Sequence, residues 1–109
     1  MSSNSEALAR LHALNDALLK MLQQATTLDD KLRLHQSMMA TSQEINSMLV
    51  MDARALAGGY TPGDGIKKAM SDLKRLQNEV HVIISDIAMA AAVLSAITQA
   101  ITFLAPLIA

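Results

Sequence analysis

The strongest pattern in the sequence runs from residue 66 to residue 108, where the chain reads IKKAMSDLKRLQNEVHVIISDIAMAAAVLSAITQAITFLAPLI. Apolar residues recur there at two positions of a seven-residue repeat. The first position holds Ile66, Leu73, Val80, Ile87, Leu94, Ile101 and Ile108, and the second holds Ala69, Leu76, Ile83, Ala90, Ile97 and Leu104. Such a repeat predicts a helix with a coiled-coil-like packing face or a long core helix of a bundle, since both need the same pattern. We expect one helix over about 64–105, ended by Pro106.

Two further helices are expected before this segment. Ser3 with Glu6, and Thr27 with Asp30, have the spacing of residues that cap the start of a helix. Apolar residues follow each pair at helical spacing, as expected for helices with one buried face. The expected helices span about residues 4–25 and 28–57.

All four glycines fall between residues 58 and 65, which predicts a turn over 58–63. With 109 residues, the chain is long enough for a single all-α domain, 1–109. The helix over 64–105 would be about 63 Å long, whereas a compact domain of this length is about 35 Å across. We therefore expect an elongated helical hairpin or three-helix bundle. Whether residues 25–27 form a turn or only a kink is left open by the sequence.

No charged side chain occurs from Ile87 onward, although nineteen occur before it. The tail is nevertheless amphipathic, because its polar residues share one helical face. These polar residues are Ser95, Thr98, Gln99 and Thr102. Its apolar side chains are costly to leave in water, so we expect helix 4–25, a second copy, a partner protein or lipid to cover them. The expected interaction seam consists of Ile66, Leu73, Leu76, Val80, Ile83, Ile87, Leu94, Ile97, Ile101 and Leu104.

The uncharged tail is also long enough to cross a bilayer, which takes about 20 residues. Its many alanines contribute little to insertion, it has no Trp or Tyr to mark an interface, and the nearest basic residue is Arg75. A constitutive membrane span is therefore not the favoured interpretation. The first residues have neither a basic leader nor an apolar core, so we expect synthesis in the cytoplasm without a signal peptide. A peripheral or inserted membrane form, and export by a signal-less route, stay open.

The residue types argue against several kinds of chemistry. The sequence has no cysteine, which excludes disulfides, thiolate metal sites and a cysteine nucleophile. Only His12 and Asp16 have the i, i+4 spacing of a helical metal site, and they lack a third ligand, so we expect no metal and no cofactor. The glycine segment lacks the ending of a phosphate loop, and no catalytic nucleophile motif occurs. We expect a non-enzymatic protein.

The composition also argues against nucleic-acid binding. The formal net charge is −1, and the chain has one Tyr, one Phe and no Trp to stack on bases. A basic face formed by Lys67, Lys68, Lys74 and Arg75 is interpreted as a solvated helix surface. Four of the eight methionines lie in the helix expected over 28–57, at Met38, Met39, Met48 and Met51. We expect them to fill the core or to form a binding surface for a heterologous helical protein.

The sequence thus predicts a protein that acts by helix–helix association, as a homo-oligomer assembled through its uncharged C-terminal helix. The alternative prediction is a membrane-active protein, of pore or anchor type, whose C-terminal helix inserts into a bilayer or lies on it.

Overall fold

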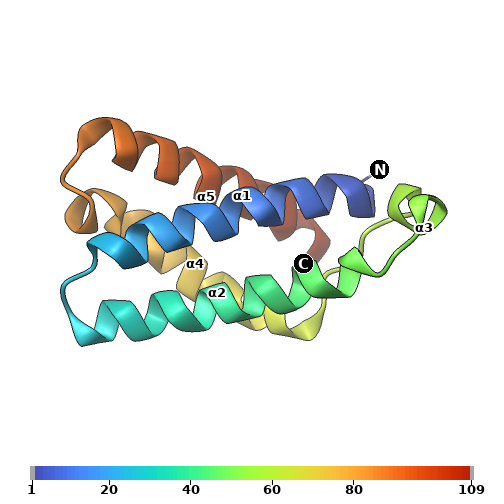
Figure 1. Ribbon diagram of the computed structural model, residues 1–109, viewed down its shortest axis with the longest axis horizontal. Coiled ribbons are helices and arrows are strands. Elements are labelled where there is room, and N and C mark those ends of the chain that lie inside the picture. The colour runs from blue at the N-terminus through green and yellow to red at the C-terminus, as the bar shows by residue number, and fades with distance from the viewer. Residues whose placement is uncertain (1, 109) are drawn as a thin grey trace.

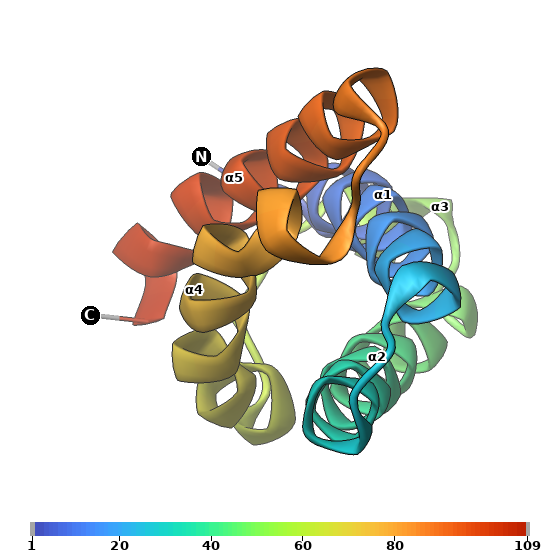
Figure 2. The ribbon, with the colours of Figure 1, turned by 90° about the vertical axis from the view of Figure 1, so that its left-hand side faces the viewer.

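The computed structural model describes residues 2–108, which form five helices. These are α1 (Asn4–Gln24), α2 (Leu28–Leu49), α3 (Ala53–Ala57), α4 (Asp64–Ile83) and α5 (Ile87–Ile108). The four long helices run alternately up and down, so that each is antiparallel to the next (Figure 1). Seen from one end, they form a ring in the order α1, α2, α4, α5 (Figure 2). The all-α class is confirmed, and the fold is an up-and-down four-helix bundle.

The first two long helices begin where the capping pairs predict. The Ser3 side chain accepts a hydrogen bond from the Glu6 N–H, and the Thr27 side chain accepts one from the Asp30 N–H. Between these helices, Ala25 has an extended backbone conformation and is buried. Residues 25–27 therefore form a turn rather than a kink, and α2 folds back along α1 (Figure 1).

The single helix expected over 28–57 is wrong, because α2 ends at Leu49 and the short α3 follows. The Asp52 side chain accepts a hydrogen bond of 2.9 Å from the Ala55 N–H and so begins a new helix. The Asn4 side-chain amide donates to the Ala55 carbonyl at 2.9 Å, which fastens α3 to the start of α1. Residues 58–63 connect α3 to α4, which begins at Asp64.

The single helix expected over 64–105 is also wrong. Residues 84–86 separate α4 from α5 and reverse the chain direction (Figure 1). Asp86 caps α5, because its side chain accepts a hydrogen bond of 2.8 Å from the Met89 N–H. Ile84 has an extended backbone and is only 1% exposed. The break in the helix is therefore stabilised by the Asp86 cap and by the burial of Ile84. Pro106 lies inside α5 instead of ending it, two residues before the end of the helix at Ile108.

The break removes the expected elongation. The principal extents are 42, 25 and 24 Å, and the radius of gyration is 13.7 Å, close to the roughly 13 Å of a compact chain of this length. The expected 63 Å helix and three-helix hairpin are therefore replaced by a bundle of four long helices. Within the described residues, α5 packs on α1 and α4 instead of continuing the direction of α4.

Candidate functional site

α5 is the element on which the sequence placed the candidate site, and it lies between α1 and α4 (Figure 2). Its inner edge is buried in the bundle core and consists of Ala90, Val93, Ile97, Ala100 and Leu104. The opposite side faces outward. We define the outer α5 face as the exposed side chains Ala88, Ala91, Ala92, Ser95, Thr98, Gln99 and Thr102.

The predicted interaction seam is largely part of this protein's own core. Its buried members are Ile66, Leu73, Leu76, Val80, Ile97 and Leu104. Its half-buried members are Ile83, Leu94 and Ile101. Ile87 alone among the seam residues is exposed, to 81%. Of the candidates expected to cover the apolar side of residues 87–105, helix 4–25 of the same chain packs against it as α1, together with α4.

The predicted polar stripe is exposed and lies on one side of α5, as its spacing indicates. Hydrogen bonds connect it to the helices on both flanks. The Gln77 side chain on α4 donates to the Thr98 hydroxyl at 2.9 Å, and the Arg10 guanidinium on α1 donates to Gln99 Oε1 at 2.6 Å. Gln99 in turn donates to the Ser95 hydroxyl at 3.0 Å. The stripe thus fixes the rotation of α5 while leaving much of its own surface open.

Two hollows border the outer α5 face. One, of about 350 Å³, is lined by Arg10, Thr98, Gln99, Thr102 and Phe103. The other, of about 220 Å³, lies between α1 and α5 and is lined by Ala13, Asp16, Ala17, Lys20, Ala92, Val93 and Ala96. Most of the second lining is alanine, so a neighbouring helix could approach the backbone closely there.

The electrostatics of this surface differ from those of the other long helices. Exposed ionised side chains occur on α1, α2 and α4, for example Asp16, Lys31 and Lys74. The outer α5 face carries methyl, hydroxyl and amide groups only. Removing such groups from water costs far less than removing charges, provided that the hydroxyl and amide groups find hydrogen-bond partners. Among the outward surfaces of the long helices, this one is the least costly to cover.

By length and composition, α5 could also cross a membrane, and it is the one such helix in the part of the chain described. Core helices of soluble proteins meet the same criterion. The buried inner edge and the polar stripe show that α5 is amphipathic within this bundle. Length and composition therefore fit both a bundle helix and a membrane helix.

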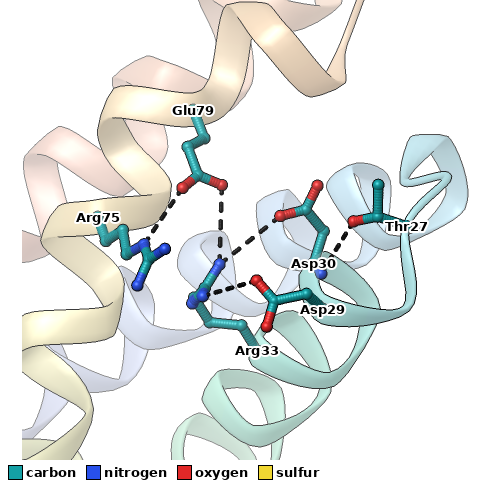
Figure 3. Close-up of polar contacts among 6 residues, drawn as sticks. All are labelled: Thr27, Asp29, Asp30, Arg33, Arg75 and Glu79. Atoms are coloured by element: carbon teal, nitrogen blue, oxygen red, sulfur yellow. Dashed lines mark hydrogen bonds and ion pairs between the residues drawn. The ribbon is translucent and has the colours of Figure 1, made fainter.

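A cluster of ion pairs connects α2 and α4 (Figure 3). Arg33, whose side chain is 11% exposed, pairs with Asp29 at 2.9 Å and lies 3.9 Å from Glu79 Oε2 on α4. Glu79 also lies 3.4 Å from Arg75. The i, i+4 spacing of Asp29 and Arg33 is a signal that could have been noticed. The cluster joins the two helices electrostatically.

The four methionines expected in the helix over 28–57 divide between core and surface, and Met51 lies beyond the end of α2. Met48 is buried, Met38 and Met51 are half-buried, and Met39 is exposed. A hollow of about 270 Å³ on α2 is lined by His35, Met38, Met39, Ser42, Gln43 and Asn46. Methionines therefore lie both in the core and beside a surface hollow.

The glycine segment is fastened to α2 by Glu44. Glu44 Oε2 accepts hydrogen bonds from the Tyr60 hydroxyl at 2.5 Å and from the Gly63 N–H at 2.9 Å. A carboxylate thus occupies the position that an anion would take at the start of α4. The basic residues Lys67, Lys68, Lys74 and Arg75 are exposed, as predicted for a solvated face. Among residues 2–108, no group of three or more potential metal-ligating side chains occurs.

No family model matches this sequence, and neither curated proteins nor solved structures include a match to it.

Proposed function

We propose that this is a non-enzymatic helical protein that self-associates through the outer α5 face. The observation that carries the proposal is the lack of any ionised group among the exposed side chains of α5, on a molecule whose other long helices all expose charges. An uncharged surface with small side chains is the one most readily buried against another helix.

A second copy of the chain is a suitable partner for this face. In a two-fold dimer the same surface lies on both sides of the interface, so a face with charges of one sign would repel itself. The outer α5 face avoids this repulsion, and Ser95, Thr98, Gln99 and Thr102 can exchange hydrogen bonds across the interface. The alanines Ala88, Ala91 and Ala92 allow two α5 backbones to approach closely.

Membrane insertion is the second candidate, favoured by the 22 uncharged residues of α5. Insertion would require α5 to leave α1 and α4, exposing the buried Val93, Ile97 and Leu104 contacts of the bundle. Each large apolar side chain moved from core to water costs about 1.5–3 kcal/mol until lipid covers it. Self-association keeps every one of these contacts, so we favour it.

The test is a charge placed at the centre of the outer α5 face. Ser95→Arg puts a guanidinium in each copy of the interface, and Ser71→Arg makes the same change at an exposed site on α4. We expect sedimentation equilibrium to show at least a tenfold weaker association for Ser95→Arg and wild-type association for Ser71→Arg. Equal behaviour of the two variants, or a monomeric wild-type protein at high micromolar concentration, would refute the proposal.

Flotation with vesicles separates the two candidates. Self-association alone predicts that the protein stays in the dense fraction with both neutral and anionic vesicles. Co-flotation accompanied by dye release would support the membrane-active candidate instead.

A further inference from the structure

The connection between α4 and α5 contains no residue that prevents a helix. It consists of Ile84, Ser85 and Asp86, without glycine or proline. The seven-residue apolar repeat also continues across it, with Val80 and Ile83 before the connection and Ile87 and Ala90 after it. Neither feature is needed for a hairpin. A straight helix over 64–108 needs a connection that can become helical, and the repeat would give that helix one continuous apolar seam.

The hairpin leaves an unfavourable exposure at this connection. Ile87 is 81% exposed although it occupies a seam position, and Val82 is 84% exposed. What favours the hairpin locally is the Asp86 cap on Met89 and the burial of Ile84. A helix cap contributes about 1 kcal/mol, so the local preference for the bend is small compared with the packing of α5.

We propose that two copies of this chain exchange α5. In the exchanged dimer, α4 and α5 of each copy join into one continuous helix of 45 residues, about 67 Å long. The α5 part of each copy then packs between α1 and α4 of the other copy. A two-fold axis at residues 84–86 places the two long helices antiparallel, which is the orientation that α4 and α5 have within one chain (Figure 1).

The exchange restores between chains the contacts that exist within one chain. The inner edge of α5 enters the same core, Gln77 meets Thr98, and Arg10 meets Gln99. Monomer and dimer therefore differ in structure only at the connection, and the fraction of dimer depends on the concentration of chains. Only a second copy supplies a receiving surface matched residue by residue to α5, which identifies the occupant.

This inference does not depend on the outer α5 face. Exchange uses the buried inner edge and the connection, whereas the proposed self-association uses exposed side chains. Ser95→Arg is expected to weaken face-to-face association and to leave exchange unchanged. Each proposal can therefore fail without the other.

The first test blocks the straight helix while preserving the hairpin. Ile87 is the first residue of α5, where proline is well tolerated, but proline within a continuous helix would break it. Leu28→Pro is the matched control, since Leu28 is the exposed first residue of α2. Both variants are made in the Ser95→Arg protein, in which face-to-face association is weakened and exchange is not. After refolding at high concentration, we expect Ile87→Pro to lower the dimer fraction at least tenfold and Leu28→Pro to leave it unchanged. The reverse result, or no dimer of the Ser95→Arg protein, would overturn the proposal.

The second test measures the distance between α4 and α5 within one chain of the dimer. The chain has no cysteine, so spin labels attached after Lys74→Cys and Thr102→Cys are the only ones present. The two positions are exposed and lie on adjacent helices, near the Gln77–Thr98 contact. In dimers of the Ser95→Arg protein, refolded with an excess of the unlabelled Ser95→Arg protein, a straight helix places the labelled residues about 42 Å apart. Neighbouring helices lie about 8–10 Å apart, so an intrachain distance below about 25 Å in the dimer would exclude exchange.

Discussion

The Tyr60 hydroxyl donates a hydrogen bond of 2.5 Å to Glu44 Oε2, across 16 residues of sequence. The same oxygen accepts the Gly63 N–H, so one carboxylate holds two points of the connection between α2 and α4. The Tyr60 ring also lies 6.0 Å from the Phe103 ring of α5. Through Tyr60, the connection is packed against two helices that are not neighbours in the sequence.

Tyr60→Phe should therefore destabilise the protein even though it retains the ring. The substitution leaves Glu44 Oε2 without one of its donors, and a hydrogen bond to a charged group contributes about 1.5–3 kcal/mol. We expect the free energy of unfolding at pH 7 to fall by about 1–3 kcal/mol, measured by urea denaturation. A loss below about 0.3 kcal/mol, which is typical of substitutions at surface positions without specific contacts, would contradict the assigned role.

The same contact predicts a pH dependence on the alkaline side. Burial raises the pKa of Tyr60 well above its usual value, and its hydrogen bond to Glu44 and the charge of that carboxylate raise it further. Because the folded protein holds this proton more tightly than the unfolded chain, the contribution is complete below about pH 10, the pKa of an unfolded tyrosine, and falls as the pH rises above it.

Tyr60 is the only tyrosine, so the phenolate absorbance of the folded protein reports on this residue alone. We expect no titration near pH 10 while the protein stays folded. The alkaline loss of stability should be steeper for the wild-type protein than for Tyr60→Phe. Phenolate formation at pH 10 in folded protein would contradict the buried contact.

Glu79→Gln tests the ion pairs between α2 and α4. The change removes the carboxylate that lies near both Arg33 and Arg75, and we expect a loss of about 0.5–1.5 kcal/mol at low salt. The loss should shrink in 1 M salt, where the screening length is about 3 Å. Asp16→Asn, at an exposed position of α1, is the control and should change stability little. Equal effects of the two variants, or no dependence on salt, would contradict a role for the cluster.

Helix starts were well predicted because their signals are local. Ser3 and Thr27 accept the expected hydrogen bonds, and the glycine-rich turn ends at Asp64 as predicted. The breaks before α3 and α5 were missed. Each depends on an aspartate cap, Asp52 or Asp86, inside a stretch whose apolar spacing alone favours continuation of the helix. The break at 84–86 allows α5 to pack on α1, and the free energy of that packing favours the break. No local sequence pattern predicts this long-range contact.

The candidate site was predicted in part for the same reason. The polar residues of the stripe over Ser95–Thr102 are exposed on one side of α5, and their i, i+3, i+4 and i+7 spacing already indicates this. Most residues of the apolar seam pack within this chain, and the seven-residue repeat does not distinguish a helix of the same chain from a helix of another. Arg10 and Gln77, which bind the stripe from the flanks, come from distant helices and have no signature of their own.

Two isoleucines of the seam provide the last prediction, because the fold places them in opposite environments. Ile97 is fully buried, whereas Ile87 is exposed at the start of α5. Ile97→Ala should lower the free energy of unfolding by about 2–5 kcal/mol, since it leaves a cavity in the core. Ile87→Ala should change it by less than about 0.5 kcal/mol in the monomer. Urea denaturation at low micromolar concentration measures both. If Ile97→Ala instead weakened association without destabilising the monomer, the inner edge of α5 would be an interface between chains, because a core residue cannot be truncated without loss of stability.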